Sequence, residues 1–122
     1  MKRPSVTYDV EASFDEDQRL HVEIAWHDSR NQFMLDIKRG TERNRRRWFD
    51  ENPELDTILR DSASLQIPLG ADGPMGLDGV GFTFKIGHVP AVTFSWWMEM
   101  PKDWAPLQNI VDRINRLVEQ EA

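Results

Sequence analysis

The feature that most constrains the fold of this chain is an alternation of apolar and polar residues with a period of two. It is clearest in two runs, over residues 80–86 and 92–98, which flank a short turn. In the second run, Phe94 and Trp96 fall on one face and Ser95 falls on the other. Successive side chains of a strand point to opposite faces of a sheet, so this pattern predicts a β-hairpin.

The same alternation occurs in the first third of the chain. Residues 6–14 and 20–26 alternate around a polar break, which predicts another hairpin, and residues 33–37 alternate once more before Gly40. Residues 65–69 also alternate and are interpreted as a strand. The sequence therefore predicts a mostly antiparallel sheet of five to six strands.

Helical spacing of apolar residues replaces the alternation near the C-terminus. We expect Asp103 to cap a C-terminal amphipathic helix that packs on one face of the sheet. A short helix is expected over residues 53–61, because Asn52 is a good cap and Pro53 is tolerated at the first helical position. The predicted fold class is α+β, in a single domain over residues 1–122. The apolar stripe of the last helix consists of Trp104, Leu107, Ile110, Val111, Ile114, Leu117 and Val118.

A basic run in the middle of the chain, residues 38–47, carries six basic side chains and one acidic one. Thr41 is placed to cap a helix through Phe49, whose arginines would face solvent or the acidic residues of 50–61. An acidic protein partner is a second interpretation. Nucleic acid is a third, because Trp48 follows the arginines directly. The role of the run stays open at this point.

The composition argues against several classes of protein. The chain has 21 Asp and Glu against 15 Lys and Arg, a net charge of −6, which opposes general binding to nucleic acid or anionic lipid. It has no cysteine, which excludes disulfides, thiolate zinc sites and cysteine nucleophiles. No apolar stretch approaches the roughly 20 residues of a membrane span, and we expect no signal peptide. A cytoplasmic protein that binds neither membrane nor nucleic acid is therefore expected.

Candidate catalytic residues are few. His27 and Asp28 are adjacent and Glu23 lies on the same predicted strand, so a small enzyme that uses these three residues is one alternative. The histidines lack the spacing of an HxH, HxxxH or HExxH motif. We therefore expect no catalytic residue, no metal and no cofactor.

Candidate partner-binding residues are more numerous. Trp97 falls out of phase with the apolar face, so it is either covered by a loop or free to anchor a partner, and Trp48 is a second candidate anchor. Carboxylates concentrate on the outer face and the turn of the first predicted hairpin, and such a surface would favour a basic protein partner and speed its association. These carboxylates belong to Asp9, Glu11, Asp15, Glu16, Asp17 and Glu23.

The last third of the chain combines a Trp-Trp pair, a proline, a third tryptophan and an amphipathic helix. The residues concerned are Phe94, Ser95, Trp96, Trp97, Pro101, Trp104 and Leu107. Over about residues 80–120 this order resembles small bacterial proteins, some of which look like immunity proteins of polymorphic-toxin or contact-dependent inhibition systems. The resemblance implies a non-enzymatic protein that binds and neutralises a cognate toxin domain. An effector chaperone or adaptor of a secretion system is the alternative.

Overall fold

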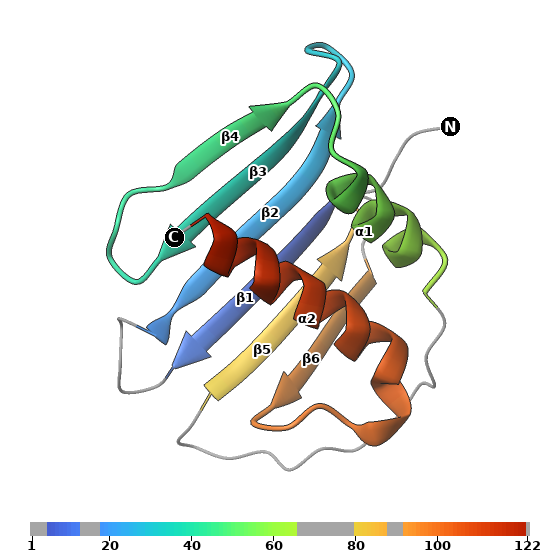
Figure 1. Cartoon of the computed structure of the whole chain (residues 1–122). Helices are drawn as coiled ribbons and strands as arrows, with labels where there is room; N and C mark the ends of the chain where they lie inside the picture. The colour runs from blue at the N-terminus through green and yellow to red at the C-terminus, as the bar shows by residue number, and fades with distance from the viewer. Residues whose placement is uncertain (1–4, 13–17, 66–79, 88–91, 122) are drawn as a thin grey trace.

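A computed structural model shows six strands and two α-helices (Figure 1). It describes residues 5–12, 18–65, 80–87 and 92–121. All strand pairings are antiparallel, and the strand order is β4-β3-β2-β1-β5-β6. The elements are β1 (Val6–Ala12), β2 (Leu20–His27), β3 (Gln32–Arg39), β4 (Arg45–Phe49), α1 (Pro53–Ala63), β5 (Val80–Ile86), β6 (Val92–Trp97) and α2 (Ala105–Gln120). The predicted fold class is therefore confirmed.

Both predicted hairpins are present. β1 pairs with β2, and β5 pairs with β6, while the pairing of β1 with β5 joins the two hairpins. The third predicted strand is β3, which Gly40 ends with a positive φ of 52°. The strand expected over 65–69 lies outside the described residues, apart from Leu65, which is not in a strand.

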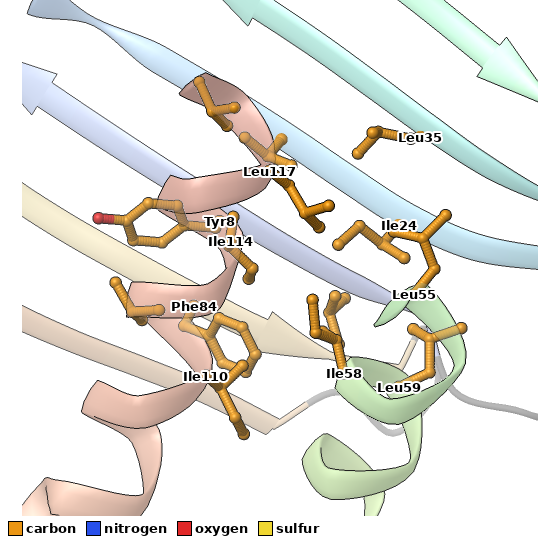
Figure 2. Close-up of a cluster of buried hydrophobic side chains, with 14 of the residues drawn as sticks. Tyr8, Ile24, Leu35, Leu55, Ile58, Leu59, Phe84, Ile110, Ile114 and Leu117 are labelled. Atoms are coloured by element: carbon orange, nitrogen blue, oxygen red, sulfur yellow. The ribbon is translucent and has the colours of Figure 1, made fainter. Parts of the chain in front are cut away.

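The two helices cover the same face of the sheet (Figure 1). Side chains from α1, α2 and the strands meet between these layers, as Figure 2 shows for Ile58, Ile114 and Phe84, each 0% exposed. The whole predicted stripe of α2 is buried, which confirms the expected packing. α1 begins as predicted, since the Asn52 side chain accepts a hydrogen bond from the Leu55 N–H at 3.1 Å.

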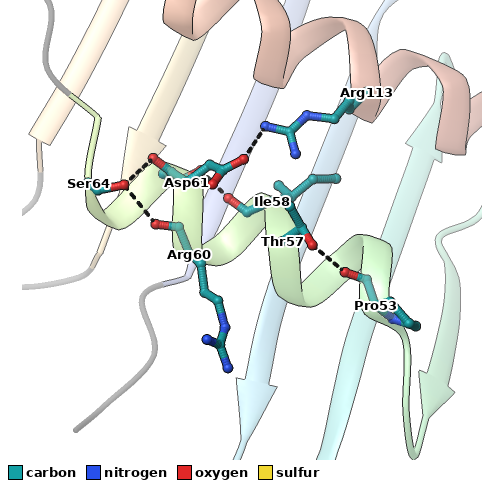
Figure 3. A network of polar contacts seen from close by, with 8 residues as sticks. Pro53, Thr57, Ile58, Arg60, Asp61, Ser64 and Arg113 are labelled. Carbon is teal, nitrogen blue, oxygen red and sulfur yellow. Dashed lines mark hydrogen bonds and ion pairs between the residues drawn. The ribbon is translucent and has the colours of Figure 1, made fainter.

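The two helices also contact each other directly. Arg113 of α2 donates a hydrogen bond to the carboxylate of Asp61 on α1, at 2.7 Å (Figure 3). The hydroxyls of Thr57 and Ser62 donate hydrogen bonds to main-chain carbonyls one turn earlier on α1, so these two side chains are satisfied within the helix. Within the described residues, neither helix is long and apolar enough to cross a membrane.

The start of the C-terminal helix differs from the prediction. Asp103 is not the cap of α2, because a short 3₁₀ helix over Lys102–Trp104 precedes it. The Trp104 N–H donates to the Pro101 carbonyl at 3.0 Å, and the Trp104 ring is buried against Trp96 and Phe94. Packing of this ring sets where the first turn begins, and it outweighs the capping preference of Asp103.

The helix predicted from Thr41 to Phe49 is also wrong. Residues 45–49 form β4, an edge strand that pairs with β3 through Ile37↔Arg45 and Phe33↔Phe49. Pairing with β3 outweighs the weak helical preference of this segment.

Candidate functional site

Among the described residues, both helices lie on one face of the sheet and none lies on the other, which we call the open face (Figure 1). Its residues alternate with those of the core, so the pairing registers define it. One row across the strands consists of Arg46, Asp36, Glu23, Thr7, Lys85 and Thr93. The next row consists of Lys38, His21, Asp9, Thr83 and Ser95. This face is polar and charged, whereas the opposite face forms the core.

The structure brings three of the predicted carboxylates to the open face. Asp9 and Glu11 stand on β1 and Glu23 stands on the neighbouring β2. Asp9 is not free, because its carboxylate is hydrogen-bonded to the His21 ring nitrogen Nδ1. Glu11 is exposed and Glu23 is half-buried. The other three, Asp15, Glu16 and Asp17, lie outside the described residues.

The open face also carries cations, on β3 and on β5. Lys38 is the cross-strand partner of His21, and Lys85 is the partner of Thr7. A cavity of about 200 Å³ at the Asp9 end of the face is lined by both signs of charge, including Glu11 and Lys38. The surface is therefore patterned and not uniformly negative.

Asp36 is the most unusual residue of the open face. It is 2% exposed, and its Oδ2 accepts hydrogen bonds from Asn44 and Arg46, both at 3.2 Å. Its Oδ1 has no hydrogen-bond partner among the described residues. Glu23 is its direct cross-strand neighbour on β2, so two carboxylates stand opposite each other. The sequence analysis missed this residue; the signal was a charged residue inside the alternating run of β3.

Trp48 is half-buried at the β4 edge of the open face. The Arg30 guanidinium carbon lies 3.8 Å from the centre of its ring, and the His27 ring meets it edge-on at 5.0 Å. Met34 is its cross-strand neighbour. A partner that contacts the covered ring face of Trp48 therefore has to displace Arg30 first.

Trp97 lies on β6, at the other edge of the sheet, and is also half-buried. Gly81 is its cross-strand partner, and a Cβ added to this glycine would lie 3.4 Å from the Trp97 ring. Part of the indole thus covers the bare backbone of β5, and the rest is accessible. Trp96, one residue earlier, is buried in the core and stacks on Phe82 at 5.3 Å, as its phase predicts.

The residues of the enzyme alternative do not meet. Glu23 and His27 are four positions apart on one extended strand, a separation of about 13 Å. Asp28 turns away and accepts a hydrogen bond from the Trp26 indole at 2.8 Å. Among the described residues, which include His21 and His27 but not His88, no group of three potential ligands could hold a metal ion.

The basic run serves the fold in a way that the sequence analysis did not foresee. Arg39 donates a hydrogen bond to the carbonyl of Val118, and Arg45 donates to the carbonyl of Glu121 at 3.4 Å. Arg47 forms an ion pair with the Glu121 carboxylate. Cations at a helix C-terminus satisfy its last carbonyls and oppose its negative dipole end. Three of the six basic residues thus bind the end of α2.

Comparisons with protein-family models, curated proteins and solved structures gave no match to this chain.

Proposed function

We propose that this protein is a non-enzymatic protein-binding module whose open face is the binding surface. The observation that carries the proposal is the co-location of the predicted binding residues. Glu11 and Glu23 lie on this face, with Trp48 and Trp97 on its two edge strands. Half-buried tryptophans beside charged groups are typical of interaction surfaces, where they act as anchors.

The charge arrangement at Glu23 supports a role beyond folding. Glu23 stands directly opposite Asp36, and two carboxylates in this arrangement weaken the pairing of their strands. Asp36 forms an ion pair with Arg46. Such a local conflict is typical of functional sites, where stability is exchanged for binding. A basic side chain of a partner, placed beside Glu23, would relieve the repulsion.

We infer further that the partner is a toxin domain with a basic surface and that the protein is a bacterial immunity protein. This inference rests on the resemblance of residues 80–120 and on the open face. The mechanism is steric and electrostatic: the face covers the toxin, and its mixed charges select the partner by their pattern. No chemical step is required of the immunity protein.

The binding surface is tested with a charge-reversed variant, Glu11→Lys combined with Glu23→Lys. The matched control is Glu119→Lys, which makes the same kind of change on an exposed position of α2. With the cognate partner, the double variant should slow association at least tenfold and reduce its dependence on salt, while the control should bind like the wild type. Equal binding by all three proteins, or association that is insensitive to salt, would rule out the electrostatic surface.

The class of partner is tested with the reading frame directly upstream of the gene. Its product is expected to be toxic on its own, and co-expression of this protein should restore growth. Relief of toxicity supports the immunity proposal. A product that is stabilised or secreted through this protein without being toxic would instead indicate an effector chaperone. Catalytic turnover that is lost in His27→Ala would favour the enzyme alternative.

A further inference from the structure

A cavity of about 240 Å³ lies between β3, β4 and the C-terminal end of α2. Two apolar residues of β3, three consecutive arginines of β4 and one carboxylate line it. These residues are Leu35, Ile37, Arg45, Arg46, Arg47 and Glu121. The cavity is therefore lined by more basic than acidic side chains, although the chain as a whole has a net charge of −6.

The pairing of β3 with β4 places two of these arginines on the helix-bearing side of the sheet. Arg45 is the cross-strand partner of Ile37, and Arg47 is the partner of Leu35. Directly opposed residues share a face of the sheet, and both of these β3 residues are buried in the core. The cavity thus combines apolar side chains with guanidinium groups, which suits a ligand that has both an apolar and an anionic part.

The three arginines differ in how their charge is balanced. Arg46 forms an ion pair with Asp36 on the open face, at 3.2 Å, and Arg47 forms one with the Glu121 carboxylate. Arg45 is exposed and has no ion-pair partner among the described residues. Its guanidinium donates a hydrogen bond of 3.4 Å to the main-chain carbonyl of Glu121, longer than the usual range of about 2.7–3.2 Å. The positive charge of Arg45 is therefore left unbalanced beside the cavity.

Size and charge narrow the class of ligand. The cavity is smaller than the pockets of about 300–1,000 Å³ that hold drug-sized molecules, so it suits a single side chain. A planar guanidinium binds a carboxylate through two parallel hydrogen bonds. A glutamate side chain joins such a carboxylate to a short apolar stem. A nucleic-acid phosphate has no apolar stem, and the net charge of the chain repels it.

We propose that this cavity binds a glutamate side chain from an acidic segment of a partner protein. The carboxylate pairs with the Arg45 guanidinium, and the methylene groups lie against Leu35 and Ile37. Because β4 is an edge strand and Arg45 is exposed, a protein segment reaches the guanidinium from the side of the sheet. The site takes an anion and lies on the helix-bearing side, so the proposal goes beyond the open face and does not depend on the proposed function.

The ligand is tested with two peptides that differ only in charge, acetyl-Gly-Glu-Gly-Glu-Gly-amide and its glutamine counterpart. Titration of the isotope-labelled wild type, followed by NMR, should give saturable shifts of the Arg45 and Ile37 amide signals with the glutamate peptide. The glutamine peptide should bind about tenfold more weakly, because it offers no charged acceptor. Added salt should weaken the binding of the glutamate peptide. Equal affinity for the two peptides, or shifts that leave Arg45 unaffected, would overturn the proposal.

The residue is tested with Arg45→Gln. Arg43→Gln is the matched control, since Arg43 is exposed in the connection between β3 and β4 and does not line the cavity. Arg45→Gln should lower the affinity for the glutamate peptide about tenfold, and the control should bind like the wild type. Equal weakening by the two variants would show that the peptide responds only to net charge, and would overturn the site. The peptide pair is measured on the wild type, so the ligand test holds even if Arg45→Gln loosens the end of α2.

Two further probes identify the source of the anion. Glutarate and a short oligothymidylate should both bind more weakly than the glutamate peptide. An oligothymidylate that binds at Arg45 more tightly would replace the protein partner with nucleic acid, and glutarate that binds as tightly as the peptide would replace it with a small dicarboxylate. None of these measurements requires a toxin, so their failure is distinguishable from failure of the proposed function.

Discussion

Arg39 donates a hydrogen bond to the main-chain carbonyl of Val118, 79 residues later in the chain. Arg39 ends β3 and Val118 stands in the last turn of α2, so this contact fixes the end of the helix on the sheet. Arg45 and Arg47 reach the same helix end through Glu121. A charge run that resembles a binding patch in the sequence is thus, in part, a cap for the C-terminal helix.

The first prediction concerns this cap. Arg39→Ala should lower the free energy of unfolding by about 1 kcal/mol, because the helix end loses a charged hydrogen-bond donor. Arg43→Ala is the matched control, since Arg43 is exposed in the turn between β3 and β4, and its loss should cost less than about 0.5 kcal/mol. Urea denaturation of both variants measures the difference. Equal stability of the two variants would show that the Val118 contact contributes nothing.

The second prediction separates the adjacent tryptophans of β6. Trp96→Ala should cost about 3–5 kcal/mol, because its ring stacks on Phe82 and meets Trp104 inside the core. Trp97→Ala removes a half-buried ring that covers Gly81, and should cost about 1–2 kcal/mol. In the proposed function, Trp97→Ala also weakens partner binding by about 2 kcal/mol. Thermal denaturation of both variants tests the stability difference, and a binding titration of Trp97→Ala tests its role as an anchor. If both variants are destabilised equally and Trp97→Ala still binds the partner normally, Trp97 is not an anchor.

The third prediction concerns alkaline pH. The pKa of Tyr8 is raised from 10.0 to about 12, mainly by burial in the core; the hydrogen bond with Asn115 opposes this shift and the charge of Asp112 adds to it. The unfolded chain releases the phenolic proton near pH 10 while the folded chain retains it. The free energy of unfolding should therefore fall by up to about 2 kcal/mol between pH 10 and 12, with no contribution below pH 10.

Tyr8→Phe is the control for this pH dependence, because it cannot ionise. Other groups titrate in the same range, so the informative quantity is the difference between wild type and variant in urea denaturation from pH 9 to pH 12. This difference should change steadily above pH 10. Parallel stability curves for the two proteins would show that Tyr8 ionises equally easily in the folded and unfolded states.

Much of the fold follows from local patterns. The alternation from Phe82 to Trp96 determines a hairpin because each strand has one buried face, and the stripe from Leu107 to Val118 is long enough to determine a helix. β4 was missed because an edge strand rich in arginine has no apolar alternation. Its stability comes from β3 and from the distant end of α2, which no short window of sequence contains.

The candidate site was predictable only in part, because a local pattern shows which face a residue occupies but not its cross-strand neighbours. Phase within a strand places Asp9, Glu11 and Trp97 on the side away from the core. Phase does not reveal cross-strand neighbours, so the Lys38 beside His21 and the Asp36 opposite Glu23 required the register between β2 and β3. The mixed charge of the open face is therefore a property of the pairing and not of any one segment.

The last prediction uses that register to separate folding from binding. Glu23→Gln removes the like-charge contact with Asp36 while keeping the shape of the side chain, so it should raise the free energy of unfolding by about 0.5 kcal/mol. Glu119→Gln, on an exposed position of α2, makes the same chemical change away from the open face and should leave stability nearly unchanged. If Glu23 binds a partner, Glu23→Gln is more stable than the wild type but binds that partner more weakly. A residue that serves only the fold does not show this combination of higher stability and lower affinity. Urea denaturation together with association kinetics decides the matter: a Glu23→Gln protein that is less stable than the wild type would mean that this carboxylate supports the fold.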